Sequence, residues 1–233
     1  MDDTTAAPWA DTLAVFDLET TGIDVETSRI VTAYVGVLGR DGEVIEQRDW
    51  IVDPGVEIPM AASIIHGVTT ERARLEGQTP PAAIAEIIAA LTEVASRGLP
   101  IVAYNAAYDL TLLDREALRY GLTALPAPGA VVDPLVIDKA VDRYRRGKRT
   151  LSATAAHYGV SLVDAHDAGA DAVAAGRVAQ AIARAFPELA TTAVAALHAR
   201  QVDWSREQAE NYQAWRRANG SPEFITSGEW PVR

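Results

Sequence analysis

The chain has 233 residues, of which 48% are hydrophobic, so it can bury a sizeable core and is not expected to be disordered. It has no cysteine, which excludes disulfides and thiolate metal sites, and its formal charge of −11 argues against a general nucleic-acid coat protein. The acidic N-terminal stretch MDDTTAAPWA is unlike a signal peptide and no apolar stretch is long enough to span a bilayer. We therefore expect a soluble, cytoplasmic protein with no membrane partner.

The first part of the chain predicts three strands joined by short connections. An apolar run over residues 13–18 is typical of a buried strand, and the β-branched residues of 29–38 predict a second. Asp41 and Gly42 supply a tight turn, after which residues 43–52 predict a third strand. These short connections favour an antiparallel meander.

Helices then alternate with short strands. Helical spacing of apolar residues begins after Thr79 and Pro80 and ends at Gly98. The elements expected after it are a strand at 99–104, a helix at 107–119, a strand near 130–135 and helices near 150–158 and 168–186. This order predicts an α/β fold, in which a mixed central sheet is flanked by helices.

The last part of the chain predicts a C-terminal helical extension, residues 187–233, packed on a domain of residues 1–186. Ser205 and Gln208 have the spacing of a capping box and predict the start of a helix that ends near 219–220. Helical aromatic residues are usually core residues, so three side chains are expected to be buried: Trp204, Tyr212 and Trp215.

The stretch VFDLETTG, residues 15–22, places two carboxylates at the end of an apolar strand. Asp17 and Glu19 project from the same face, because side chains two residues apart in a strand do so. Their charges repel unless a cation lies between them, and oxygen ligands of this kind suit Mg²⁺ or Mn²⁺. For this motif alone, solvated acids at a frayed strand end are an equally good interpretation.

Two later segments carry residues of the same chemical kind. Asn105 follows a strand and Asp109 opens a helix, where the helix dipole alone would favour a carboxylate. In HDAGADA, His166 precedes a helix and Asp171 lies just over one turn inside it, among small residues. An imidazole beside carboxylates can take a proton from water near neutral pH, although a lone histidine is more often a satisfied polar group.

These three segments, in this order, resemble the DEDDh exonucleases, a family that includes the proofreading exonuclease subunit of bacterial DNA polymerase III. The resemblance covers about residues 12–185 and implies the ribonuclease H-like fold. Five residues match the family's three motifs: Asp17 and Glu19 in the first, Asp109 in the second, and His166 with Asp171 in the third.

The resemblance implies a metal-dependent 3′–5′ exonuclease that releases nucleoside 5′-monophosphates from single-stranded or frayed DNA. In such a site Asp17 would bridge two Mg²⁺ or Mn²⁺ ions, Glu19 and Asp171 would complete the shell of one, and Asp109 would hold the other. His166 would take the proton from the attacking water.

The resemblance also suggests contacts with the substrate. The turn after the first motif is expected against the terminal nucleotide, and IHGVT, residues 65–69, resembles an element near it, although a turn histidine without a role remains an alternative. The basic segment RYRRGKR, residues 143–149, either grips upstream phosphates or is a solvated helix end. Asn105 would position either the substrate or its own turn. The candidate contacts are Thr20, Thr21, Gly22, His66, Val68, Asn105, Arg145, Arg146 and Lys148.

Two alternatives remain open for the partner. The same chemistry could act on RNA or short oligonucleotides, and the discrimination depends on how the site treats the 2′-hydroxyl. A catalytically silent module that binds a polymerase or a nucleic-acid end is less favoured, because the set of acidic residues is complete. An association with a DNA polymerase is a further expectation, weakened by the lack of an obvious clamp-binding peptide in the tail.

Overall fold

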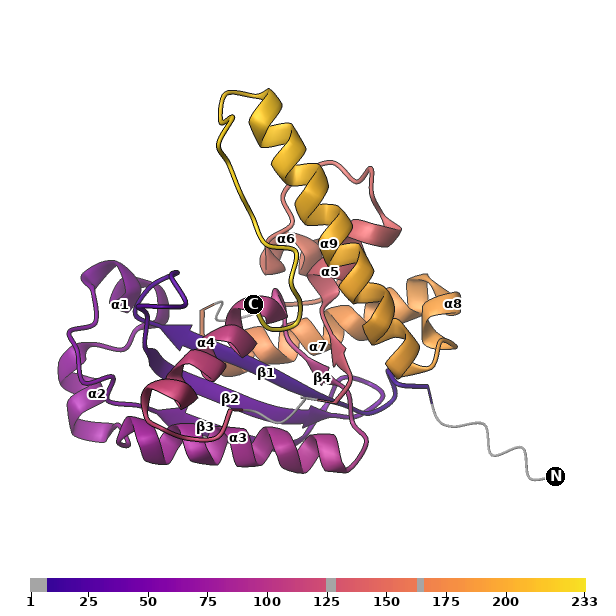
Figure 1. Ribbon diagram of the computed structural model, residues 1–233. Coiled ribbons are helices and arrows are strands. Elements are labelled where there is room, and N and C mark those ends of the chain that lie inside the picture. The colour runs from indigo at the N-terminus through magenta and orange to yellow at the C-terminus, as the bar shows by residue number, and fades with distance from the viewer. Residues whose placement is uncertain (1–7, 125–128, 163–165) are drawn as a thin grey trace.

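The computed structural model describes residues 8–124, 129–162 and 166–233. Its strands are β1 (Leu13–Thr20), β2 (Ile30–Leu38), β3 (Val44–Ile51), β4 (Ile101–Val102) and β5 (Val131–Val132). They form one mixed sheet in the order β3-β2-β1-β4-β5 (Figure 1). The first three make the antiparallel meander that the sequence predicts, and β4 and β5 run parallel to β1.

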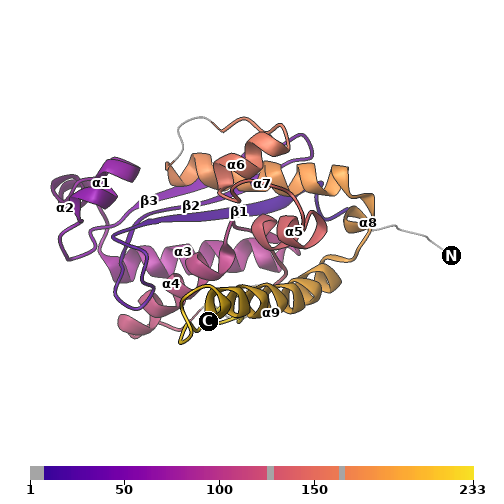
Figure 2. The same ribbon diagram turned by 90° about the horizontal axis from the view of Figure 1, so that it is seen from above.

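Helices cover both faces of this sheet. They are α1 (Met60–His66), α2 (Thr70–Glu76), α3 (Pro80–Ser96), α4 (Ala106–Arg119), α5 (Pro134–Val141), α6 (Leu151–His157), α7 (Ala168–Ala185), α8 (Pro187–Ala190) and α9 (Val194–Ala218). Figure 2 shows α3 and α4 below the sheet and α6 and α7 above it, which confirms the predicted mixed sheet flanked by helices. Among the described residues, no helix is both long and apolar enough to cross a bilayer.

β1 is the central strand and is buried on both faces. Phe16 and Leu18 belong to the core under α3 and α4, whereas Leu13 and Val15 belong to the core under α7. A strand covered on both sides needs an apolar side chain at every position, which explains the continuous apolar run at its start. The run ends where the polar residues of the first motif begin.

The packing of α7 on the sheet depends on a glycine. A Cβ atom at Gly176 would lie 2.5 Å from the side chains of both Leu38 and Val15, so only glycine lets the helix backbone approach β1 and β2 this closely. Ala172 and Ala175 are also buried on this face. The small residues therefore place the N-terminal turn of α7 over the end of β1.

The region of the predicted strand near 130–135 is partly helical. Only Val131 and Val132 are in β5, because Asp133 caps α5 and Pro134 occupies its first turn, where a missing N–H is tolerated. The short helices α1 and α2, on either side of Gly67, were likewise not predicted.

The predicted start of the C-terminal helix is wrong. α9 begins at Val194, eleven residues before Ser205, and Gln208 lies inside it, donating to the Val136 carbonyl instead of closing a capping box. The expected burial of the tail aromatics is also wrong in two cases, since Tyr212 is 47% exposed and Trp215 is 58% exposed. The predicted end of the helix, near residue 219, is confirmed.

α9 runs beside α5, and the segment after it returns toward α4 (Figure 1). The side chain of Gln201 is buried and bonds both to the Val131 carbonyl and to the Asp133 N–H, so α9 is tied to the end of β5. The boundary between a catalytic domain and an extension at residue 186 stays a prediction.

Candidate active site

The first motif ends β1. The ladder to β2 has a bulge between Glu19 and Thr20, a feature that commonly re-aims side chains beside active sites. Burial, followed by repulsion from the Asp109 and Glu19 carboxylates, raises the pKa of Asp17 well above its ordinary value. Burial, followed by repulsion from Asp171, raises the pKa of Glu19 to about 8. The two acids are therefore held where their negative charges are poorly solvated.

The second motif brings a carboxylate to the same place from α4. Asp109 is 4% exposed, and burial raises its pKa although the nearby Leu18 N–H favours the charged form. That N–H belongs to the residue between Asp17 and Glu19, so Asp109 lies against the end of β1. Asn105, which precedes α4, has a left-handed φ of 64°, a conformation that asparagine tolerates better than most residues.

The third motif closes the group from α7. Glu19, His166 and Asp171 each offer a ligand atom within 4.8 Å of the others. The His166 N–H donates to Asp171 Oδ2 over 3.3 Å, and the backbone of His166 has a φ of 75°. Strained backbone of this kind is concentrated at functional sites. In the described part of the chain, Asn105 and His166 are the two non-glycine residues with a positive φ.

These side chains fit a divalent cation. Asp171 Oδ1 is buried and has no hydrogen-bond partner among the described residues, which is the condition of an oxygen awaiting a cation. Four carboxylates repel one another here, and hard cations with oxygen ligands relieve such repulsion. The residues that could hold the metal are the four carboxylates of the motifs: Asp17, Glu19, Asp109 and Asp171.

A family model described as exonuclease, of the RNase T type, matches residues 14–179, a span that contains all three motifs. The chain belongs to this exonuclease family. Two curated relatives are the PolC-type DNA polymerases III of Lacticaseibacillus paracasei and Clostridium perfringens, each 28% identical, over 168 and 171 residues. Each alignment covers 72% of this chain and 11% of the relative, so the chain corresponds to a small part of those proteins.

Solved structures show the same fold. E. coli exonuclease I in complex with a dA16 oligonucleotide has a TM-score of 0.67 at 21% identity, covering 77% of this chain and 42% of that chain. A zinc-bound complex of the same enzyme with single-stranded DNA has a TM-score of 0.67 at 22% identity, with the same coverage. The ribonuclease H-like fold implied by the motifs is therefore confirmed.

In this member of the family the turn after the first motif is locked by a residue that the sequence analysis missed. Tyr108 Oη lies 2.8 Å from Thr20 Oγ1 and 2.5 Å from the Gly22 carbonyl. Thr21 Oγ1 accepts the Arg29 N–H at 2.9 Å. The threonine hydroxyls thus serve the turn itself, and the position of Tyr108 directly before Asp109 was the available signal.

The IHGVT segment lies beside the same turn. The imidazole of His66 is next to the Thr20 backbone, its Nδ1 accepts the Val68 N–H, and its buried Nε2 has no partner among the described residues. Burial lowers the pKa of His66. Val68 is 4% exposed and packs with Val31, so its side chain is not presented to a ligand. A substrate contact by His66 stays a prediction. The side chain of Val68 is too buried to make one in this structure.

A second residue missed by the sequence analysis is Asp133, which is 1% exposed. Its Oδ1 accepts the Asn105 and Leu135 N–H groups at 3.0 and 2.9 Å. Its Oδ2 accepts the Ala106 N–H at 2.9 Å and the Trp230 indole N–H at 3.4 Å. Asp133 therefore fixes the start of α4, three to four residues before Asp109.

The basic segment is partly structural. The buried Asp138 carboxylate binds Arg145 at 2.7 Å and Arg149 at 2.5 Å, so Arg145 is already paired inside the protein. Arg146 and Lys148 are exposed and make no ion pair with any described residue. Phosphate binding by the segment stays a prediction, and Arg146 and Lys148 are its better candidates.

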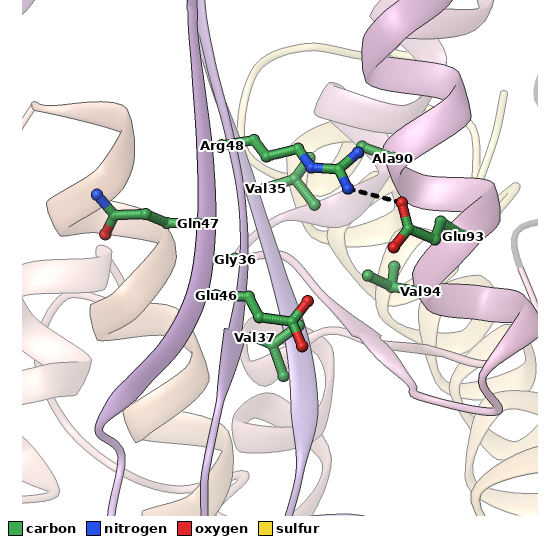
Figure 3. Close-up of a pocket in the computed structure, with 9 residues that line it drawn as sticks. All are labelled: Val35, Gly36, Val37, Glu46, Gln47, Arg48, Ala90, Glu93 and Val94. Atoms are coloured by element: carbon green, nitrogen blue, oxygen red, sulfur yellow. Dashed lines mark hydrogen bonds and ion pairs between the residues drawn. The ribbon is translucent and has the colours of Figure 1, made fainter.

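A small crevice elsewhere lacks these groups. Figure 3 shows it between β3, β2 and α3, bridged by the ion pair of Arg48 and Glu93, whose N and O atoms are 2.7 Å apart. Its volume of about 30 Å³ has room for only two or three water molecules, since one needs roughly 10–15 Å³ by this measure. It is too small for a nucleotide and carries none of the motif residues.

Proposed function

We propose that this chain is a metal-dependent 3′–5′ exonuclease that acts on single-stranded or frayed DNA and releases nucleoside 5′-monophosphates. The observation that carries the proposal is the meeting of four carboxylates and one imidazole, from β1, α4 and the N-terminal turn of α7, at one edge of the sheet. Membership of the exonuclease family supports hydrolysis of phosphodiester bonds.

Each residue has a distinct task in the proposed reaction. Asp17 is close enough to the carboxylates of Asp109, Glu19 and Asp171 to be repelled by all three, so it would hold metal together with each of them. When bound there, two Mg²⁺ or Mn²⁺ ions supply Lewis-acid stabilisation of the charge that grows on the phosphate. His166, exposed beside Glu19 and Asp171, accepts the proton of the attacking water.

The fold neighbours support DNA as the substrate. E. coli exonuclease I is described in complexes with dA16 and dT13 oligonucleotides, and its chain shares the fold of this one. The PolC-type polymerases are DNA polymerases, which supports a proofreading or repair setting and an association with a polymerase. RNA remains the alternative substrate, because the same acids would cut either polymer.

The deciding experiment is digestion of a 5′-labelled single-stranded DNA with Mg²⁺ or Mn²⁺, beside matched duplex DNA and RNA. We expect a ladder that shortens from the 3′ end and yields nucleoside 5′-monophosphates, fastest on single-stranded DNA. Asp17→Asn should abolish the ladder, whereas Asp203→Asn, which alters an exposed acid on α9, should not. An intact substrate with every metal would refute the enzyme, and faster loss of RNA would reassign the substrate.

A further inference from the structure

The catalytic edge of the sheet extends beyond the motif residues. β1, β4 and β5 are parallel, so their carboxyl ends lie at one edge, where Asp133 follows β5 and Glu19 is the last residue but one of β1. Asp133 is near enough to the Asp109 carboxylate to repel its charge. The surface beyond Asp133 is therefore within reach of a chain bound at the acids.

A groove leaves this edge between α5 and α9. Its inner part, of about 170 Å³, is lined by Asn105 and Asp133, and its outer part, of about 440 Å³, by Arg143 and Arg149. Figure 1 shows α9 running along α5 above the sheet. Three side chains line both parts, which therefore adjoin, and we call the two together the α5–α9 groove: Lys139, Gln208 and Tyr212.

The outer part of the groove is basic, although the chain is acidic. Four of its lining residues are basic, namely Lys139, Arg143, Arg145 and Arg149, and one is acidic, Glu207, in a chain of formal charge −11. Arg145 and Arg149 are paired with the buried Asp138, and Arg143 lies 3.6 Å from Glu207. The side chain of Lys139 makes no hydrogen bond or ion pair with any described residue. A mostly basic lining with an unpaired Lys139 matches a polyanion, and the phosphate backbone of a nucleic acid is one.

The α9 wall adds a fixed aromatic surface. Tyr212 stacks on Trp215 with ring centroids 6.2 Å apart and planes 15° apart, and it meets the edge of Phe224 at 5.4 Å. Tyr212 is nevertheless 47% exposed, so part of the residue stays accessible beside the groove. Proteins that bind single-stranded nucleic acids commonly combine basic side chains along the phosphate backbone with exposed aromatic rings on which bases stack.

We propose that the α5–α9 groove holds the nucleic-acid strand on the 5′ side of the cleaved bond, with Lys139 against a phosphate and Tyr212 stacked on a base. The inference rests on the proposed function, because the strand enters from the catalytic acids. It assigns the C-terminal helix a direct part in substrate binding. It also predicts that short substrates, which end before the groove, are bound without its help.

The test separates the groove from the catalytic centre by substrate length. The p-nitrophenyl ester of thymidine 5′-monophosphate occupies the terminal position alone, whereas dT12 is long enough to follow the groove. Lys139→Gln and Tyr212→Ala should each hydrolyse the ester at the wild-type rate. Affinity for dT12, measured by fluorescence anisotropy in an Asp17→Asn background, should fall roughly five-fold or more for Tyr212→Ala, the low end of one lost base–aromatic stack.

The salt dependence tests the charge. Lys139→Gln should reduce the slope of log K against log salt for dT12 by about 0.7, the value for one phosphate contact on a single strand. Arg184→Gln is the matched control, since Arg184 is exposed at the opposite end of α7 from Asp171. It should leave both affinity and slope unchanged.

The outcomes distinguish two failures. If the wild type cuts neither the ester nor dT12, the proposed function is wrong. If it cuts the ester but both groove variants bind dT12 as the wild type does, the groove inference alone is overturned. Equal losses on the ester and on dT12 would also overturn it, because they would place Lys139 and Tyr212 in the catalytic centre instead.

Discussion

Tyr108 Oη lies 2.8 Å from Thr20 Oγ1 and joins α4 to the turn that follows β1. The bond crosses 88 residues of sequence and connects the residue before Asp109 with the residue after Glu19. The metal-ligand candidates of two motifs are thus held at a fixed separation by their immediate neighbours. Ligands placed in this way need little rearrangement when a cation or a substrate binds.

We expect Tyr108→Phe to loosen the turn without unfolding the protein. It removes the hydroxyl that bonds Thr20 and the Gly22 carbonyl, a loss of about 1 kcal/mol in the free energy of unfolding. The KM for single-stranded DNA should rise more than kcat falls, because the resemblance to the DEDDh exonucleases places this turn against the terminal nucleotide. Steady-state kinetics and urea unfolding measure both. Tyr144→Phe, at a residue 89% exposed, is the control, and equal kinetics for the two variants would contradict the role.

The metal-free protein should become less stable as the pH rises from about 5 to 8. Glu19 has its pKa raised to about 8, from an ordinary value near 4.3 in the unfolded chain. Between these values the folded state binds more protons than the unfolded state, so the free energy of unfolding falls with rising pH. Thermal melts in chelator at pH 5.5 and 8 measure the effect.

Asp17→Asn should raise the melting temperature of the metal-free protein at pH 8, because it removes one of the mutually repelling charges. Mg²⁺ should stabilise the wild type but stabilise Asp17→Asn much less. Asp203→Asn, at an exposed acid, should behave as the wild type in both respects. If the melting temperature of the wild type did not change on addition of Mg²⁺, the proposed metal site would be contradicted.

Asp133→Asn should lower kcat as well as stability. An amide has one acceptor oxygen in place of two, so at least one of the buried N–H groups of Asn105, Ala106 and Trp230 loses its partner. An unsatisfied buried donor costs about 1–3 kcal/mol in the free energy of unfolding. Because α4 starts at this point, Asp109 should shift, and the Mg²⁺ concentration for half-maximal activity should rise. A loss of stability with unchanged metal dependence would leave Asp133 purely structural.

Asp138→Asn should destabilise the fold by about 3–5 kcal/mol, because two guanidinium groups then lose their buried counter-charge. Burial alone would raise the pKa of Asp138, but the bonds from Arg145 and Arg149 outweigh it and lower that pKa. The stability that Asp138 contributes is present above its ordinary pKa and is lost in acid below it. Denaturant unfolding should therefore show the wild type more stable than Asp138→Asn at pH 7, and this difference in the free energy of unfolding should shrink at pH 3. Asp203→Asn should cost at most about 1 kcal/mol, as an exposed pair does.

Local patterns along the chain were enough to predict β1 to β3, α3, α4 and α7, and to select Asp17, Glu19, Asp109, His166 and Asp171 as the candidate set. Alternation, helical periodicity and short motifs are properties of neighbouring residues, so they are visible in one dimension. The start of α9 was not visible, because the capping signal at Ser205 is overridden by the burial of Leu197 and Gln201. Tertiary burial commonly outweighs a local preference of this size.

The supporting residues belong to a different class. Asp133 meets Asn105 only because β4 and β5 are adjacent, and Tyr108 meets Thr20 only because α4 crosses the end of β1. Tyr212 is exposed beside Lys139 because α9 runs along α5. Contacts between residues far apart in sequence depend on how whole elements pack, and no local periodicity records that. The acids of the site can therefore be read along the chain, whereas the shell that holds them and the groove that leads to them emerge from packing.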